Sequence, residues 1–167
     1  MKRPLTFPVL VFGLYAGLFA TGVTPAAPSP KTHPCALITR ADAARALGLQ
    51  PRPGVAAPAS DYAPANAPDT TCAYFGAPKG FVRVTYMGDV HDYTDFHNRM
   101  GADAIDVHGI GDAAFWIKGN GEMLHVMRHG FAFTVILHYQ TGNTTLADPQ
   151  APLPQLIVLA KAGASRL

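Results

Sequence analysis

Three strand-like segments joined by very short turns constrain the fold of this chain more than any other feature. The segments AAFWIK, EMLHVMR and FAFTVILHY fall between residues 113 and 139, and they are separated by GNG and by His129-Gly130. Aromatic and β-branched residues favour strands, and turns of two or three residues join neighbouring antiparallel strands. The sequence therefore predicts an antiparallel meander over these residues.

A two-residue turn at His129-Gly130 also predicts the register of the last two strands. Counting back from this turn places apolar side chains opposite one another: Val126 opposite Phe133 and Leu124 opposite Val135. An apolar face of this kind must be covered by another element. The C-terminal segment can cover it, because apolar residues recur there near helical spacing: Leu156, Leu159, Ala160 and Leu167.

Other elements are expected earlier in the chain. The runs CAYF and FVRVTYM flank the turn-like GAPKG and predict a hairpin. One helix is expected to begin at Thr39 and end at Gly48, and another covers HDYTDFHNRM, with Asp92 or Thr94 as its cap and Gly101 as its end. Together these elements predict a single α+β domain, an antiparallel sheet of about five strands with helices on one face.

The N-terminus has the layout of an export signal. Two basic residues precede an apolar run over residues 7–20, which is short for a bilayer-spanning helix, and small residues follow it. We expect residues 1–26 to be a signal peptide that is cleaved after Gly22 or Ala26. An uncleaved N-terminal anchor is the alternative, and only in that case is contact with a membrane expected.

The rest of the chain divides into a tether and one domain. Residues 27–34 are typical of a Pro-rich tether, and residues 35–167 are expected to form the domain. Within the domain, residues 51–71 hold five prolines and almost no large apolar side chain. This composition predicts a long surface loop without regular structure.

The balance of charge argues against a nucleic-acid ligand. The chain holds 13 Lys and Arg and 11 Asp and Glu, and removal of Lys2 and Arg3 with the signal makes the two totals equal. Nucleic-acid binding usually needs a basic surface that displaces counterions from phosphates, and no Lys/Arg cluster supplies one. We therefore expect no nucleic-acid partner.

Two cysteines, Cys35 and Cys72, remain after removal of the signal. An even number of cysteines in an exported protein favours a disulfide. A catalytic thiol or a pair of metal ligands is the competing interpretation, but the chain has no C-x-x-C and no partner at ligand spacing. We expect the two cysteines to be bonded and to stabilise the fold.

The stretch GIGDAA at residues 109–114 fits G-x-G-x-x-G/A, the phosphate-binding turn of dinucleotide enzymes. That turn needs a helix after it, because the pyrophosphate is bound by N-terminal amides. Here an aromatic and β-branched run follows, which predicts a strand. We expect a structural turn in which the glycines adopt positive φ and Asp112 bonds nearby amides, and we expect no cofactor.

Met123, His125 and Met127 form the most suggestive metal-ligand pattern. They alternate along one expected strand and therefore share a face, and thioether and imidazole groups are suitable ligands for Cu(I). His138 is expected on the same face of the neighbouring strand. A half-exposed sheet face with mixed residues is the alternative interpretation.

The sequence gives little support to an enzyme. The serines after the signal lie in the tether, the loop and the last helix, without G-x-S-x-G, and H-E-x-x-H is absent. Acidic residues gather at helix starts, where capping explains them. Trp116 and Tyr139 are expected to be packing residues rather than the lining of a pocket. An enzyme whose site is assembled from scattered residues stays open as a third hypothesis.

Four short motifs follow one another in an order that a known family shares. PCALIT at 34–39 opens a helix, CAY at 72–74 starts a strand, VHGIGDAA spans 107–114, and LAK at 159–161 lies in the last helix. In this order the chain resembles a family of small secreted bacterial proteins of unknown function, many of them cell-envelope lipoproteins. The resemblance implies paired cysteines and an extracytoplasmic α+β domain for binding, without catalytic residues. The chain departs from those members because no lipidation cysteine follows its apolar run.

These observations favour an exported, non-enzymatic module, periplasmic or secreted, that binds a protein or cell-envelope ligand. An immunity-type inhibitor of a secreted toxin is one form of this hypothesis, because such proteins are small, exported and free of catalytic motifs. The alternative is a periplasmic copper-binding protein that uses Met123, His125 and Met127.

Overall fold

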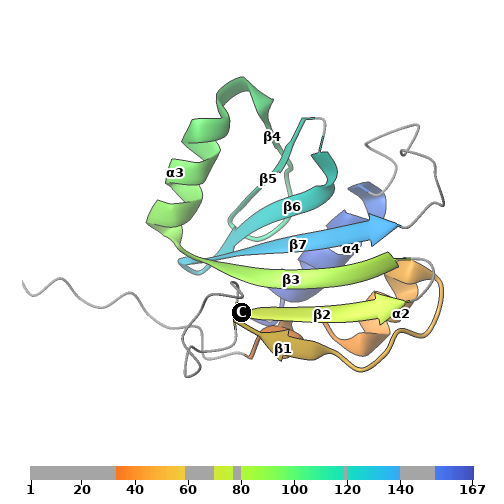
Figure 1. Ribbon diagram of the computed structural model, residues 1–167. Coiled ribbons are helices and arrows are strands. Elements are labelled where there is room, and N and C mark those ends of the chain that lie inside the picture. The colour runs from red at the N-terminus through yellow and green to blue at the C-terminus, as the bar shows by residue number, and fades with distance from the viewer. Residues whose placement is uncertain (1–32, 59–69, 77–79, 119, 140–152) are drawn as a thin grey trace, which may run out of the picture.

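One antiparallel sheet organises the part of the chain that the structure describes (Figure 1). This computed structural model describes residues 33–58, 70–76, 80–118, 120–139 and 153–167. The sheet has seven strands in the order β1-β2-β3-β7-β6-β5-β4. Its strands are β1 (Val55–Ala57), β2 (Thr71–Gly76), β3 (Gly80–Asp89), β4 (Ala104–Asp106), β5 (Ala113–Ile117), β6 (Asn120–Arg128) and β7 (Phe131–Tyr139).

Helices accompany the sheet, which confirms the predicted α+β class. In the described residues they are α1 (Pro34–Leu37), α2 (Arg40–Leu47), α3 (Val90–Met100), the short 3₁₀ helix η1 (Gly101–Asp103) and α4 (Leu153–Ala164). The five expected strands are present as β2, β3, β5, β6 and β7. Two edge strands of three residues each, β1 and β4, raise the number to seven. Segments this short show no alternation in the sequence, and they exist because their backbone groups pair with β2 and β5.

β1 corrects one prediction. The sequence predicts no regular structure over residues 51–71, but Val55–Ala57 pair with Thr71, Cys72 and Ala73. The neighbouring prolines lie outside the three paired positions, so they do not remove a donor from this ladder. Residues 59–69 of the predicted loop lie outside the described part of the chain.

The predicted register between the last two strands is confirmed. Val126 lies opposite Phe133 and Leu124 opposite Val135. The turn residues His129 and Gly130 adopt φ values of 49° and 81°, as a two-residue turn between twisted strands requires. α4 covers the resulting apolar face, with several of the expected residues buried: Leu156, Leu159 and Ala160.

Two apolar clusters lie on opposite faces of the sheet. The larger cluster joins α1, α2 and α4 to the central strands, and the smaller one joins α3 to β5, β6 and β7 through Tyr93, Phe115 and Ala132. The prediction of helices on one face is therefore wrong for α3, which lies over one end of the opposite face (Figure 1). The reason is that Phe115 and Ala132 alternate with the residues of the larger cluster, so this end of the sheet is apolar on both sides.

The helix ends follow local capping chemistry. Thr39 and Asp42 form a reciprocal capping box at α2, and Gly48 ends it with a left-handed φ of 67°, as predicted. At α3 the cap is Asp89, not Asp92 or Thr94. Asp89 accepts bonds from the backbone of residues 91 and 92, and the Asp92 carboxylate accepts the Asp89 amide in return.

The predicted disulfide joins Cys35 of α1 to Cys72 of β2 across a sequence separation of 37. The Tyr74 hydroxyl, two residues along β2, donates to the backbone carbonyl oxygens of Cys35 at 3.0 Å and Ile38 at 2.6 Å. The bond and these contacts therefore hold the start of the domain against the sheet.

The N-terminal predictions are mostly untested by the described residues. The expected signal peptide, residues 1–26, lies outside them, as does the tether up to residue 32. Pro34 already begins α1, so the predicted tether, residues 27–34, extends too far. Proline suits a first helical position because the amide it lacks would be unpaired there. Among the described helices, none is long and apolar enough to cross a membrane.

Candidate functional site

The structure places His125, the centre of the predicted Met/His pattern, beneath α3. His125 is only 4% exposed to solvent. The imidazole stacks on Phe115 with ring centroids 4.8 Å apart and meets the Phe96 ring of α3 edge-on at 4.9 Å. His125 is therefore part of a buried aromatic cluster and not of a half-exposed face.

The two ring nitrogens of His125 have different surroundings. Nδ1 lies 2.8 Å from Thr134 Oγ1 and 3.3 Å from Met87 Sδ. Nε2 is buried and has no hydrogen-bond partner among the described residues. Burial lowers the pKa of His125 to about 4, which keeps the imidazole neutral near pH 7. A neutral imidazole keeps one nitrogen lone pair that can bind a metal ion.

The three predicted metal ligands, Met123, His125 and Met127, occupy alternate positions along one face of β6. Met123 lies opposite Ile136 and Met127 opposite Ala132, each two residues from His125 along the strand, and Met127 packs in the cluster of Phe115 beneath α3. His138 shares the face but contacts Phe81 and Glu122 instead. Among the described residues, no three His, Cys, Asp or Glu side chains are placed to hold a metal ion together.

The sulfur that contacts His125 belongs to Met87, which is not among the predicted metal ligands. Period-two alternation places Met87 on the same face as Thr85, and Thr85 pairs with Thr134. That signal could identify Met87 only if β3 were known to lie beside β7. The two strands are distant in sequence, so their pairing is a property of the folded sheet.

A second group of side chains lies at the opposite end of this sheet face. There β2 ends, β3 begins and β7 ends, at the end of the strands far from α3 (Figure 1). Strands rise about 3.3 Å per residue, so Phe81 lies about 20 Å along β3 from Met87. This distance leaves the end of the face uncovered by α3.

Three rings occupy directly paired positions on this uncovered end, and we call them the aromatic row: Phe75, Phe81 and His138. The Phe75 and Phe81 ring centroids are 6.0 Å apart, and those of Phe81 and His138 are 5.2 Å apart. Phe75 is 46% exposed, and Val55, on the same face of β1, is 57% exposed. The aromatic row is therefore an apolar patch that solvent reaches.

Charged side chains border the aromatic row. The guanidinium carbon of the exposed Arg83 lies 5.6 Å from the centroid of the Phe81 ring. Glu122 is already engaged, since its carboxylate lies 2.8 Å from His138 Nδ1. No hydrogen bond or ion pair engages the Arg83 guanidinium within the described ranges. The row therefore carries one cation with unused donors.

A third feature is a groove of about 240 Å³ between α2 and α4. Most of its lining is apolar, with two charged residues at one side: Ala46, Pro154, Val158, Leu159, Asp42 and Arg45. Pockets for small molecules usually have volumes of about 300–1,000 Å³, so the groove is small for that purpose.

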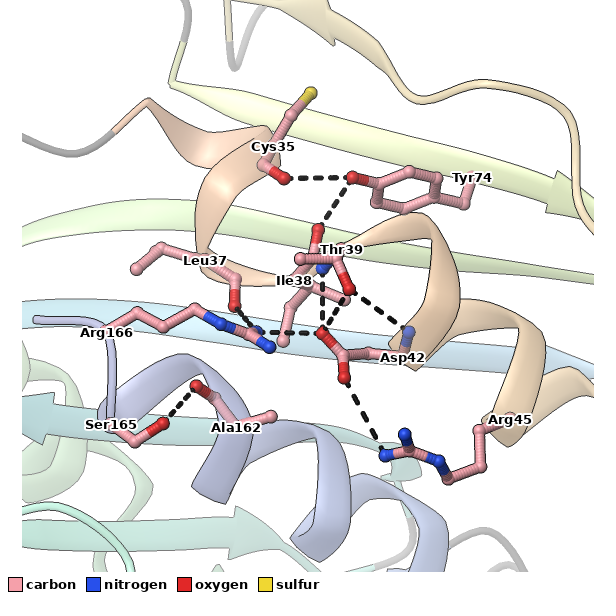
Figure 2. Close-up of polar contacts among 10 residues, drawn as sticks. All are labelled: Cys35, Leu37, Ile38, Thr39, Asp42, Arg45, Tyr74, Ala162, Ser165 and Arg166. Atoms are coloured by element: carbon pink, nitrogen blue, oxygen red, sulfur yellow. Dashed lines mark hydrogen bonds and ion pairs between the residues drawn. The ribbon is translucent and has the colours of Figure 1, made fainter.

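Asp42, beside this groove, has a structural role (Figure 2). One carboxylate oxygen accepts bonds from the Thr39 amide at 2.9 Å and the Thr39 hydroxyl at 2.7 Å, and it lies 2.8 Å from Arg166 Nη1. Burial alone would raise the pKa of Asp42, but the bonds from Thr39 and Arg166 outweigh it and lower the pKa. Arg166 also donates to the Leu37 carbonyl oxygen, so the network ties α1 and α2 to the chain after α4.

The GIGDAA turn behaves as predicted. Gly109 and Gly111 adopt positive φ values of 78° and 57°, and strand β5 follows instead of a helix. The Asp112 carboxylate accepts the His129 amide at 2.7 Å and lies 2.7 Å from Arg128 Nη1. These contacts therefore hold the residues just before β5 against the turn between β6 and β7.

Two further predictions concern aromatic residues. Trp116 is 6% exposed and belongs to the larger apolar cluster, as expected of a packing residue. The side chain of Tyr139 lies outside the described part of the structure.

Comparison of the chain with protein-family models, curated proteins and solved structures finds no match. The resemblance to a family of small secreted bacterial proteins therefore stays a prediction. Function must be inferred from the geometry of the sites.

Proposed function

We propose that this chain is an exported, non-enzymatic module that binds a protein partner through the aromatic row. The observation that supports this proposal is the exposed ring of Phe75, paired with the half-buried Phe81 beside Arg83, whose guanidinium has no ion-pair partner among the described residues. Aromatic residues and arginine are enriched at the centres of protein interfaces, where a few of them supply most of the binding energy.

The position of the aromatic row favours a rigid docking surface. Its members are paired across β2, β3 and β7, so the partner meets side chains held by the sheet and not by a loop. Little ordering is then needed when the partner binds, which lowers the entropic cost of association. A contiguous exposed apolar patch on a small domain commonly marks an interaction site.

The proposed place of action is the periplasm or the cell exterior. The disulfide between Cys35 and Cys72 is consistent with an oxidising compartment. The cell-envelope ligand expected as an alternative partner would use the same exposed surface. An immunity-type inhibitor is one form of the proposal, in which the partner is a secreted toxin.

Affinity capture tests the proposed function. The full chain, tagged at its C-terminus, is recovered from its native host alongside Phe75→Ser and the matched surface variant Val158→Ser, because both side chains are about half exposed. We expect one protein to be recovered with the wild type and Val158→Ser and to be lost with Phe75→Ser. A partner retained equally by all three chains would place binding elsewhere.

Copper binding is a second candidate, favoured by the buried Nε2 of His125, which has no hydrogen-bond partner among the described residues. It retains the predicted set Met123, His125 and Met127. Titration of the metal-free protein with Cu(I) against a chromogenic chelator tests it. Binding that His125→Phe abolishes and His91→Gln preserves supports the site, whereas affinity no tighter than micromolar ends the hypothesis.

A further inference from the structure

We infer that the aromatic row recognises an anionic aromatic group, a carboxylate next to an aromatic side chain, as an acidic-aromatic peptide segment presents. This inference rests on the proposed function and specifies the chemistry of the partner. It follows from three properties of the uncovered end of the sheet: a cation without an ion-pair partner among the described residues, the exposed Phe75 ring next to the Phe81 ring that this cation contacts, and a neighbouring carboxylate that is already engaged.

The cation is Arg83. Its guanidinium carbon lies 5.6 Å from the centroid of the Phe81 ring, and the side chain is exposed to solvent. A guanidinium presents its donors in a planar fork that matches the two oxygens of a carboxylate. Because Arg83 has no ion-pair partner in the described chain, a ligand carboxylate would not need to displace one.

The apolar part of the site is Phe75. Nearly half of this side chain is open to solvent, and its ring already lies 6.0 Å from the Phe81 ring at an interplanar angle of 50°. Tilted and offset arrangements are the ones that aromatic pairs prefer. A third ring from a partner can extend the row toward Val55, burying apolar surface that is now exposed.

The charged side chains at the aromatic row favour an anionic ligand that carries a single carboxylate. Glu122 is bonded to His138, so it is not free to form an ion pair with a ligand cation at the row. The only other charged side chain assigned to the row is Arg83, among the residues the structure describes. A single unpaired cation suits one carboxylate, whereas a nucleic acid or an anionic membrane surface needs several cations to displace counterions.

An NMR titration with phenylacetate as the probe tests this inference on the folded, disulfide-bonded chain. Phenethylamine has the same ring with a cation, and acetate has the carboxylate without a ring, so the two serve as matched ligand controls. Arg83→Gln removes the proposed cation. Arg99→Gln is the matched protein control, because Arg99 also lies over a phenylalanine ring, Phe96, at 5.7 Å.

We expect phenylacetate to shift the signals of Phe75, Phe81 and Arg83 with a weak dissociation constant of about 10 mM, as suits a small fragment. Arg83→Gln should weaken this binding by about tenfold or more, the loss typical of one charge-assisted hydrogen bond. Arg99→Gln should leave it unchanged. Phenethylamine and acetate should each bind at least severalfold more weakly.

Three results would overturn the inference: phenethylamine binding as well as phenylacetate, equal losses in the two arginine variants, or shifts confined to other parts of the fold. A different result would overturn the proposed function, so the two can be told apart. If Phe75→Ser abolishes partner capture while phenylacetate does not bind the row, the chemistry inferred for the partner is wrong and the docking surface stands. If Phe75→Ser leaves capture unchanged, the docking surface itself is wrong.

Discussion

His125 combines near-complete burial with one satisfied and one unsatisfied ring nitrogen. Its neutral form is compatible with the surrounding rings of Phe96 and Phe115, and its charged form would lose hydration without gaining a carboxylate. The same arrangement suits a packing histidine and a metal ligand. Its pH dependence and its metal affinity therefore need separate measurements.

Acid should destabilise the fold through His125. Because burial lowers the folded-state pKa to about 4, the unfolded chain binds a proton between about pH 6.5 and pH 4 and the folded chain does not. Stability is fully present above pH 6.5 and should fall by about 3 kcal/mol by pH 4. Urea denaturation at pH 7.5, 5.5 and 4.5 measures this loss.

The matched variants are His125→Phe and His91→Gln, since His91 is exposed on α3. His125→Phe should flatten the dependence between pH 6.5 and 4, and His91→Gln should keep it. An unchanged slope in His125→Phe would assign the acid sensitivity to other groups.

Asp42 should contribute to stability and not to binding. Replacing it with alanine removes the capping box with Thr39 and the ion pair with Arg166, and we expect a loss of about 2 kcal/mol. Asp95→Ala, at an exposed position of α3, should change the free energy of unfolding by less than about 0.5 kcal/mol. Chemical denaturation at pH 7 compares the two variants, and equal stability would contradict the role of Asp42.

The GIGDAA turn allows a similar comparison between two glycines of one element. Both have positive φ, but a Cβ on Gly111 would lie 2.4 Å from the Met127 carbonyl oxygen, whereas a Cβ on Gly109 meets nothing within 4 Å. Gly109→Ala should therefore cost about 1 kcal/mol and Gly111→Ala about 3 kcal/mol or more. Thermal and urea unfolding of both variants test this order, and a larger loss for Gly109→Ala would refute it.

Elements with strong local signals were predictable from the sequence. The meander follows from short turns and from alternation in strands of five to nine residues. The helix ends at Gly48 and Gly101 are predictable because glycine is favoured just after the last turn of a helix. The cap at Thr39 is predictable because the Asp42 carboxylate lies three residues later, as a capping box requires. Asp89 was missed because three acidic or hydroxyl residues compete as caps within one short segment.

Elements defined by pairing alone were not predictable. β1 and β4 have three residues each, and their strand character comes from neighbours. The position of α3 was missed because the sequence does not say which strand of the predicted hairpin pairs with which strand of the predicted meander. The two are joined through β3 and β7, and this join makes one sheet whose second face has an apolar end.

The same join explains why the aromatic row was missed as a site. Phe75 and Phe81 belong to the predicted hairpin, and His138 to the meander, so only the β3–β7 pairing brings all three together. Period-two alternation along FVRVTYM is enough to place Phe81 and Arg83 on one face of a strand. It could not show that α3 leaves this end open, because the packing of a helix depends on the whole sheet.

The disulfide should support the whole domain. It closes a long loop, and by the chain-entropy estimate its loss costs about 4 kcal/mol, a large share of the stability of a small domain. We expect the double variant Cys35→Ser with Cys72→Ser to unfold at a much lower urea concentration than the oxidised protein. Wild-type protein unfolded in the presence of a reductant is the control and should match the variant. Equal midpoints for oxidised protein and variant would contradict this role.

The affinity of the reconstituted complex tests most directly whether this protein is a binding module. The dissociation constant of the purified chain and its captured partner is measured by calorimetry for wild type, Phe75→Ser and Val158→Ser. Loss of an interface ring typically costs more than about 1.4 kcal/mol, so Phe75→Ser should weaken binding at least about tenfold. Val158→Ser should bind like wild type. A tenfold loss confined to Val158→Ser would contradict the proposal and assign binding to the groove between α2 and α4.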